Sequence, residues 1–322
     1  MKKIGVLTSG GDAPGMNAAI RAVVRGGIYH GLRVYGIHRG FEGLIHGEIE
    51  ELKAGSVADL IHRGGTVLRS ARSNDFMTEA GLQRALDMTK MFGLDGIVII
   101  GGDGSLRGGL ALAERGVTVV GLPGTIDNDL GYTDFTIGFD TAVNTVLDAI
   151  GKVRDTSTSH DRCTVVEVMG RSCGDIAYYA GIAGGAEFIL TPEIESEETL
   201  TALCRKVIEG QNRGKLHSIV IRTEGCKTAT QELIELLEER TGMESRAVVL
   251  GYVQRGGSPS AQDRMLASRM GYRAVELFLE HAGTRAVGVR GMDLIDLDLK
   301  EALDIERVSD SGLLQLADIL SI

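Results

Sequence analysis

The 322-residue sequence has few features of a membrane, secreted or nucleic-acid-binding protein. No apolar run is long enough to span a bilayer, and the N-terminus MKKIGVLTSGG lacks the apolar region and cleavage site of a signal peptide. A formal net charge of -10 argues against nucleic acid as a partner. The cysteines show neither CxxC spacing nor the histidine pairs of a zinc site, so we expect four reduced thiols. The expected location is therefore the cytoplasm.

Proline is also scarce, with 4 residues against 45 glycines. Abundant glycine indicates many tight strand-to-helix turns and places where the backbone can approach a ligand closely. Apolar residues make up 43% and charged residues 24% of the chain, which is typical of a folded globular protein. The length suits two domains of ordinary size.

Short β-branched runs alternate with longer helical patterns along the whole chain. We predict strands at KIGVLT, RVYGIH, GIVII, VTVVGL, CTVVEVM, EFIL, SIVIRT and AVVLGYV. Such runs are apolar on both faces, which is typical of parallel strands covered by helices, so the predicted class is α/β. Glycine-rich strand ends dominate residues 1–130 and arginine-bearing strand ends dominate 162–255. This contrast predicts a nucleotide half and an acceptor half.

Two glycine-rich segments follow predicted strands and open predicted helices. SGGDAPGMNAAI (9–20) fits neither GxGxxG nor GxxxxGK[ST], so it indicates an anion-binding loop without indicating a dinucleotide or Walker-type site. IIGGDGSLRGG (99–109) adds Asp103 to a second such loop. A carboxylate beside a phosphate cradle suggests a bridging Mg²⁺ ion. The alternative is that Asp103 caps a helix beginning near Ser105.

A third polar strand end, GTIDND (124–129), carries Thr125, Asp127 and Asp129. Asp and Asn are common in turns, so a turn is one explanation of this segment. Phosphoryl transfer is the other, because it needs positioning, a metal to neutralise charge and a base for the acceptor hydroxyl. Taken with the two anion-binding loops, GTIDND favours phosphoryl transfer.

These segments resemble bacterial ATP-dependent 6-phosphofructokinases, in the order and at the spacing of that family. The matching segments between residue 4 and about residue 271 are TSGGDAPGMNAAIR, RGGT with SAR, IGGDGS, GLPGTIDNDL, TSTSH, VVEVMGR, CGD, IAGGAE, LGYVQRGGSP and DRMLASRMG. The resemblance implies two similar three-layer domains, each a mostly parallel sheet with helices on both faces. It assigns residues 1–140 and about 256–305 to ATP, and 141–255 and about 306–322 to the sugar phosphate.

The resemblance also implies roles in transfer of the ATP γ-phosphate to the 1-hydroxyl of fructose 6-phosphate. Asp127 would be the base, Asp129 would support it, Thr125 would contact the transferring group, and Asp103 would hold Mg²⁺. The other residues implied at the ATP phosphates are Gly11, Arg72, Ser73, Gly102, Gly104, Ser105 and Arg171. Gly104 and Gly124 replace the Asp and Lys that are usual in pyrophosphate-dependent relatives, which favours ATP as the donor.

The sugar phosphate would be bound by residues from two subunits. Besides Thr125 and Asp127, the implied contacts are Arg162, Met169, Gly170, Arg171, Glu224, Arg246, Tyr252 and Arg255. Arg162 and Arg246 would hold the 6-phosphate from a neighbouring subunit, so the implied assembly is a homotetramer. Tyr252 replaces the usual histidine, which predicts altered binding of the sugar phosphate.

A second anion site is suggested by Arg21 and Arg25, which lie four residues apart on a predicted helix. Like charges at this spacing destabilise a helix unless an anion lies between them, and Arg21 would be roughly 15 Å along the axis from Gly11. A solvated helix face is the alternative. The resemblance implies an allosteric pocket for ADP and phosphoenolpyruvate, formed by Arg21, Arg25, Arg154, Gly185, Glu187, Arg213, Lys215 and His217. Ala54 replaces a common arginine of that pocket, so the effector response is not predicted.

Three other functions remain as alternatives. Other small-molecule kinases use a GGDG loop but lack the combination of PGTIDND, MGR and QRGGSP. A pyrophosphate-dependent phosphofructokinase would differ in its donor. A catalytically silent nucleotide sensor is disfavoured by the presence of Asp103, Thr125 and Asp127.

Overall fold

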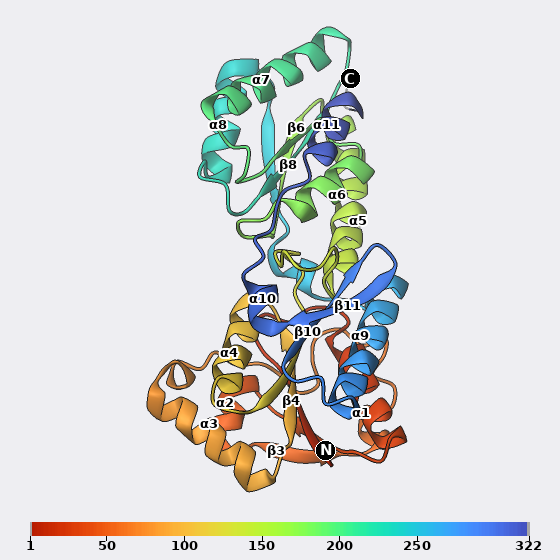
Figure 1. Cartoon of the computed structure of the whole chain (residues 1–322). Helices are drawn as coiled ribbons and strands as arrows, with labels where there is room; N and C mark the ends of the chain where they lie inside the picture. Colours follow the sequence, from red (N-terminus) through yellow and green to blue (C-terminus); the bar gives the residue numbers. More distant parts are fainter. Residues whose placement is uncertain (1, 321–322) are drawn as a thin grey trace. The chain divides into compact units, whose positions relative to one another are not determined.

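The computed structural model describes residues 2–320, which divide into two compact units. Unit 1 contains the chain up to Thr141 together with Arg255–Arg307. Unit 2 contains Ala142–Gln254 together with the chain from Val308 onward. Each unit has its own sheet with helices packed against it (Figure 1).

In the described residues, unit 1 has a seven-stranded sheet in the order β11-β10-β5-β4-β1-β2-β3. The five central strands are parallel, while β3 and β11 are antiparallel to their neighbours at the two edges. All six residues of β4 are buried, as expected for a central parallel strand. The strands are β1 (Lys3–Thr8), β2 (Arg33–Ile37), β3 (Ile49–Leu52), β4 (Gly96–Gly101), β5 (Thr118–Pro123), β10 (Arg285–Arg290) and β11 (Asp293–Asp298).

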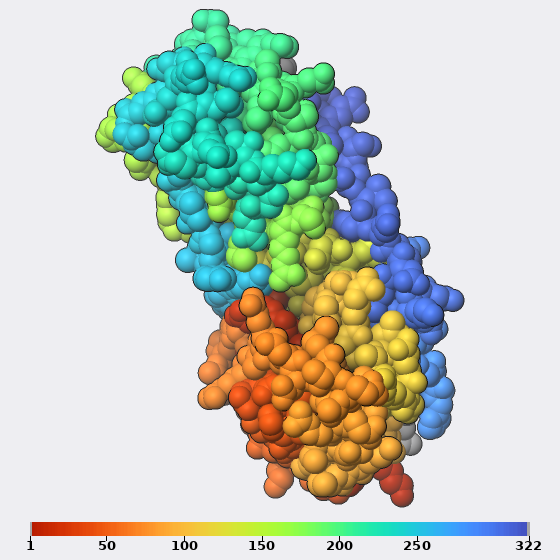
Figure 2. All heavy atoms as spheres, turned by 90° about the vertical axis from the view of Figure 1, so that its left-hand side faces the viewer, coloured from red at the N-terminus to blue at the C-terminus, as the bar shows by residue number. Residues whose placement is uncertain are grey.

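Helices cover both faces of the unit 1 sheet (Figure 1). One face carries α1 (Met16–Tyr29) and α9 (Ala261–Leu279), which pack against each other. The other carries α2 (Gly40–His46), α3 (Glu79–Phe92), α4 (Asp103–Ala113) and the short α10 (Leu299–Leu303). Figure 2 views unit 1 from the side of α3 and α4, coloured orange and yellow. Two 3-10 turns, η1 (Ala54–Val57) and η2 (Asp75–Met77), complete this unit.

Unit 2 has a four-stranded sheet in the order β7-β8-β6-β9, parallel throughout the described residues. Its strands are β6 (Cys163–Val168), β7 (Phe188–Leu190), β8 (Ser218–Thr223) and β9 (Ser245–Val249). The helices α7 (Glu197–Asn212) and α8 (Thr230–Thr241) cover one face, where Val165, Leu203 and Leu233 are fully buried. The other face carries α6 (Asp175–Ala183), α11 (Ser311–Leu320) and the unit 2 part of α5 (Phe139–Thr158).

The predicted α/β class with mostly parallel sheets is confirmed, and strands lie at all eight predicted positions. The second half of one prediction, AVVLGYV, is wrong: β9 ends at Val249, and Gly251–Arg255 forms the 3-10 turn η3. Left-handed backbone at Gly251, with φ at 51°, ends the extended run. The strands β3, β10 and β11 were not predicted. Between residues 2 and 320, no helix has both the length and the apolar character needed to cross a membrane.

Asp263, in the first turn of α9, joins that helix to the start of α5. Its carboxylate accepts hydrogen bonds from the backbone N–H groups of Gly138 and Thr141, each at 2.8 Å, and from the Thr141 hydroxyl at 2.5 Å. Burial raises the pKa of Asp263 to about 6, against the lowering effect of these hydrogen bonds. The structure therefore favours the protonated form of a group that is ionised in the unfolded chain at pH 5.

The stability of the protein should depend on pH through Asp263. Because its folded-state pKa lies above the unfolded value, the carboxyl stabilises the fold most fully below about pH 4, and this contribution is lost as the pH rises through 6. Urea unfolding measures this effect. As the pH is lowered from 7.5 to 4, the unfolding free energy of the wild type should rise by on the order of 3 kcal/mol relative to that of Asp263→Asn. A difference that stays constant over this range would contradict the assignment.

Candidate active site

Three neighbouring strands of unit 1 place the predicted phosphate-binding and catalytic segments together. The strands β5, β4 and β1 are adjacent and parallel, so their carboxyl ends meet at one edge of the sheet. The backbone N–H of Ser9 donates to the Ile100 carbonyl at 3.1 Å, and the N–H of Gly124 donates to the Gly101 carbonyl at 3.0 Å. These hydrogen bonds join the loops that follow the three strands.

The first loop, between β1 and α1, has the backbone conformation that its glycines allow. Gly10 and Gly15 have φ values of 82° and 107°, in the left-handed region that other residues rarely adopt. Gly15 directly precedes α1, so the loop leads into a helix N-terminus with free N–H groups. At Gly11 a β-carbon would lie 2.4 Å from Nη1 of Arg255, whose guanidinium also donates to the Asp12 carbonyl at 3.3 Å. Arg255 therefore brings positive charge to this loop.

The second loop places Asp103 at the first residue of α4, directly after Gly102. Gly102, not Asp103, is the N-cap residue, so the capping alternative for Asp103 is wrong. The Asp103 carboxylate accepts hydrogen bonds from Nε of Arg107 at 2.9 and 3.1 Å, and its side chain is 43% exposed. A β-carbon added at Gly104, the next residue of α4, would meet no atom within 4 Å, so there is open space at that position.

The third segment, GTIDND, is braced by its own turn residues. Asn128 has a left-handed φ of 52°, accepts a hydrogen bond from the Thr136 N–H and donates one to the Asp134 carbonyl. The Thr136 hydroxyl donates to the Thr125 carbonyl at 2.6 Å. Thr125 Oγ1 in turn accepts the N–H of Asp127 at 3.1 Å. Asn128 is therefore the turn residue of GTIDND. Its backbone conformation and hydrogen bonds hold the backbone of Asp127 and Asp129 on either side of it.

Asp127 is the more deeply buried of the two carboxylates in this segment. Its exposed fraction is 2%, while Asp129 is partly buried. Thr125 lies beside the second loop, because a β-carbon at Gly102 would be 3.5 Å from the Thr125 β-carbon. The structure thus brings Thr125 next to the start of α4, with Asp127 two residues farther on. Burial withdraws a carboxylate from bulk water and strengthens its electrostatic effect on a bound group.

The segment with Arg72 and Ser73 lies before η2. Arg72 is exposed. Ser73 Oγ accepts the N–H of Phe76 at 3.2 Å, which gives this hydroxyl a structural contact. The Phe76 ring stacks on Phe41 with ring centroids 4.1 Å apart.

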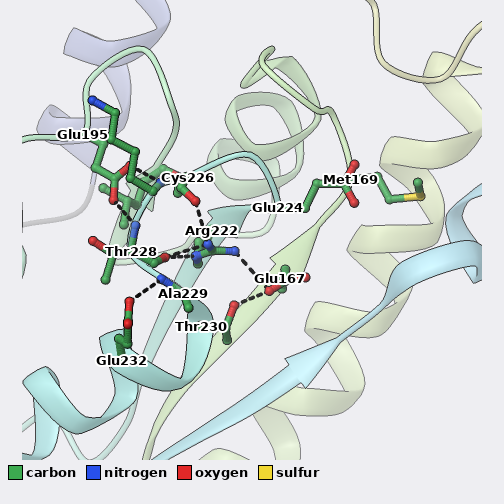
Figure 3. A network of polar contacts seen from close by, with 12 residues as sticks. Glu167, Met169, Glu195, Arg222, Glu224, Cys226, Thr228, Ala229, Thr230 and Glu232 are labelled. Carbon is green, nitrogen blue, oxygen red and sulfur yellow. Dashed lines mark hydrogen bonds and ion pairs between the residues drawn. The ribbon is translucent and has the colours of Figure 1, made fainter.

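In unit 2, the carboxyl ends of β6 and β8 bring Met169, Gly170, Arg171 and Glu224 together. The Glu224 N–H donates to the Val168 carbonyl at 2.7 Å, and Glu224 Oε1 accepts the Arg171 N–H at 3.4 Å. Gly170 and Arg171 both have left-handed φ values, of 134° and 54°. Figure 3 shows Met169 and Glu224 beside the loop that follows β8.

Arg162 and Arg246 lie at the opposite end of the same sheet. Arg162 directly precedes β6, and Arg246 is the second residue of β9, paired in register with Thr164. Both guanidinium groups contact Oε1 of Glu244, at 3.1 Å from Arg162 and 2.5 Å from Arg246. Because β6 extends over Cys163–Val168, about 20 Å separates these arginines from Met169 and Gly170.

The predicted effector residues of unit 2 also form one cluster. The Arg154 guanidinium donates to the carbonyls of Gly184 and Gly185, at 2.5 and 2.9 Å. Lys215 forms an ion pair with Glu187 at 2.5 Å, and His217 contacts the Thr158 hydroxyl at 3.1 Å. Burial lowers the pKa of His217. The remaining predicted residues of this set are Arg213, which is exposed at the end of α7, and Arg21 and Arg25 on α1 of unit 1. Ala54, which replaces a common arginine of the family, is exposed in η1.

Several residues that support these segments were not predicted. Arg107 could have been found, because it follows Asp103 at the i, i+4 spacing of a helical ion pair. Gln254 is fully buried, and its Oε1 accepts the Met169 N–H at 3.1 Å, a contact over 85 positions that sequence spacing does not reveal. Tyr252, two residues earlier, is 83% exposed.

Comparison with known proteins gives one consistent family. The phosphofructokinase family model matches residues 3–278. The curated ATP-dependent 6-phosphofructokinase of Alkaliphilus metalliredigens is 58% identical over 322 residues, which cover 100% of both chains. That of Clostridium tetani is 58% identical over 321 residues, again 100% of both. The solved structure of phosphofructokinase from Saccharomyces cerevisiae matches with a TM-score of 0.90 and 33% sequence identity. The match covers 100% of this chain and 48% of the Saccharomyces chain.

Proposed function

The chain belongs to the phosphofructokinase family, and from this premise we propose that it is an ATP-dependent 6-phosphofructokinase. It transfers the γ-phosphate of ATP to the 1-hydroxyl of fructose 6-phosphate and forms fructose 1,6-bisphosphate and ADP. The observation that carries this function is the convergence of two anion-binding loops and GTIDND at the carboxyl ends of β1, β4 and β5. The two bacterial relatives, matched over their whole length, carry the same activity in their names.

The proposed mechanism uses Asp127 as the general base. Its carboxylate accepts the proton of the 1-hydroxyl as that oxygen attacks the γ-phosphorus and the bond from the γ-phosphorus to ADP breaks. Thr125 contacts the transferring group, and Asp129 supports the base. The N-termini of α1 and α4 supply N–H groups to the phosphates. Arg72 and Arg171 add positive charge, since a guanidinium matches phosphate oxygens bidentately.

Asp103 is the proposed protein contact of a magnesium ion. The fit rests on its exposed carboxylate at the start of α4 and on the open space at Gly104. Magnesium usually takes one or two carboxylates together with substrate phosphates and water. When bound, the ion neutralises charge on the β- and γ-phosphates. Arg107 holds the Asp103 carboxylate in place through two Nε contacts.

The sugar phosphate is proposed to bind between two copies of the chain. Arg162 and Arg246 lie about 20 Å from Met169 and Gly170, at opposite ends of β6, which is too far for one sugar phosphate to bridge. One copy would provide Asp127, Met169 and Glu224, and another would provide the two arginines for the 6-phosphate. This separation supports a site shared by two copies, and the resemblance implies that the assembly is a homotetramer. A cytoplasmic location fits its glycolytic substrates.

The cluster around Glu187 and Lys215 is proposed as part of an allosteric site for ADP and phosphoenolpyruvate. Four of the predicted effector residues, Arg154, Lys215, Arg213 and His217, can carry positive charge in unit 2. Arg21 and Arg25 would complete the site. Glu187 would take an effector-bound magnesium ion after exchanging its contact with Lys215.

The direct test is an ADP-release assay with fructose 6-phosphate, ATP and magnesium. We expect turnover with ATP and little with pyrophosphate, and a changed response to fructose 6-phosphate when ADP or phosphoenolpyruvate is added. Preference for pyrophosphate would refute the ATP-dependent assignment. Nucleotide binding without turnover would instead identify the chain as a silent sensor.

Gly104→Asp tests the choice of phosphoryl donor. A side chain at this position meets open space, so the variant should fold normally, whereas a β-carbon at Gly124 would lie 2.9 Å from Ile100. An added carboxylate beside the phosphates should raise the KM for ATP about tenfold through like-charge repulsion. Gly151→Asp is the matched control, because this exposed glycine of α5 also has open space around it. An equal KM for ATP in both variants would argue against the proposed position of ATP.

A further inference from the structure

A charged residue lies inside the apolar strand β8 and is almost completely buried. Arg222 belongs to the run SIVIRT, and its exposed fraction is 3%. A buried guanidinium destabilises a fold unless its N–H groups are paired. Arg222 is two residues before Glu224, which the proposed function places at the sugar phosphate. Figure 3 shows this guanidinium at the centre of a polar network.

The Arg222 guanidinium donates hydrogen bonds both to the neighbouring strand β6 and to the turn that follows β8. On one side, Nη1 donates to Glu167 Oε2 at 3.0 Å; Glu167 is its register partner on β6 and also accepts the Thr230 hydroxyl. On the other side, Nε and Nη2 donate to the Thr228 carbonyl at 3.0 and 2.6 Å, and Nη2 donates to the Cys226 carbonyl at 3.1 Å. Arg222 therefore ties the turn after β8 to the neighbouring strand.

The same turn is held from outside by Glu195, which lies in the connection between β7 and α7. Its carboxylate accepts the N–H groups of Lys227 and Thr228, at 2.5 and 2.7 Å. Carbonyl groups of the turn thus bind Arg222 while its N–H groups bind Glu195 (Figure 3). Residues 226–228 have little freedom to move with both contacts in place.

The position of this turn determines the position of the loop at residues 169–171. A β-carbon at Gly225 would lie 1.7 Å from the Arg171 carbonyl oxygen, so the two backbones are in the closest contact that glycine allows. Glu224 is bonded to this loop through Arg171 N–H. Movement of residues 225–228 would therefore displace both Glu224 and the loop that carries Met169, Gly170 and Arg171.

We infer that Arg222 is a positioning residue for the sugar phosphate: by tying the turn after β8 to Glu167, it sets the place of Glu224 and of the loop at residues 169–171. It touches no reacting atom and acts only through these neighbours. The inference rests on the proposed function, which puts Glu224 and Met169 at the sugar. Its effect should be strongest on the sugar phosphate, because the two glycine-rich ATP-binding loops belong to unit 1 and have no bond to Arg222 in the described residues. Arg171 is the proposed phosphate contact that moves with the loop at residues 169–171, so kcat should fall as well.

The test measures KM for each substrate in four variants. Arg222→Met removes every donor, and Arg222→Lys keeps the charge but loses the fork that reaches Glu167 and the two carbonyls together. Glu224→Gln tests the proposed sugar contact itself. Lys206→Met is the control, because it removes a partly buried cation of unit 2 that lies on α7 and pairs with Asp318 of α11 at 3.0 Å.

We expect Arg222→Met to raise the KM for fructose 6-phosphate about tenfold while the KM for ATP changes less than about twofold. Arg222→Lys should recover part of this loss, and Lys206→Met should resemble the wild type. If Glu224→Gln raises the sugar KM and Arg222→Met does not, the positioning role is wrong. If Glu224→Gln has no effect, the proposed sugar site is wrong instead.

A general loss of folding would give a different result from a loss of positioning. A parallel rise of both KM values in Arg222→Met, with a lowered melting temperature and no recovery in Arg222→Lys, would reduce Arg222 to a structural residue and overturn the inference. If Arg222→Met gives no folded protein, Glu195→Gln takes its place, since it loosens the same turn while Arg222 stays intact. An unchanged sugar KM in both Glu195→Gln and Arg222→Lys would then also refute it.

Discussion

Replacement of Asp127 by serine should lower kcat about 10²- to 10⁴-fold, the usual contribution of a general base. Serine cannot accept the proton of the 1-hydroxyl at neutral pH, so the attacking oxygen remains an alcohol in the transition state. ATP binding should be retained, because the anion-binding loops after β1 and β4 offer backbone N–H groups at helix N-termini to the phosphates. Initial rates at saturating substrates, together with direct measurement of ATP binding, separate the two effects.

Asp129→Ser is the matched control for this variant. It removes a carboxylate of the same size from the same segment, two residues farther along the chain, and leaves the Asn128 turn in place. The loss of kcat should be clearly smaller than in Asp127→Ser, because Asp129 supports the base without accepting the proton. Near-normal turnover in Asp127→Ser, or an equal loss in both variants, would remove Asp127 from the role of base.

Replacement of Arg162 by serine should raise the KM for fructose 6-phosphate about 10- to 100-fold, the value of one charged hydrogen bond to phosphate. A mixture of Arg162→Ser and Asp127→Ser chains, dissociated and reassembled together, should recover activity. If each site combines Asp127 of one copy with Arg162 of another, some sites of the mixture contain both native side chains. The measurement is turnover at a low concentration of fructose 6-phosphate before and after mixing.

A mixture of Asp127→Ser and Asp103→Asn chains is the control for this experiment. Both residues lie at the same edge of the unit 1 sheet, after β4 and β5, so every site in that mixture lacks one of them. We expect no recovery there. Failure of the first mixture to recover, although mixed assemblies form, would mean that one chain builds the whole sugar site and would contradict the shared arrangement.

The segments that were predicted from the sequence are shaped by residues that lie close to them along the chain. Gly10, Gly15 and Asn128 take left-handed backbone conformations within a few residues of the groups they position, so spacing along the chain records their role. The i, i+4 pair of Asp103 and Arg107 is local in the same way. The strand prediction failed where Gly251 ended the extended run, and it missed the edge strand β11, whose residues DLIDLD are no more than half-buried.

The sequence by itself determined the α/β class, the two anion-binding loops and the carboxylates of GTIDND, because strand periodicity, glycine turns and neighbouring side chains are properties of short segments. Only the tertiary structure decided which distant residues meet. It paired Arg222 with Glu167, joined Asp263 to the start of α5, and put Arg162 and Arg246 at the end of β6 opposite Met169. The Asp263 contact joins positions 125 residues apart through the packing of helix starts. The order of the parallel strands, rather than spacing along the chain, determines the other two.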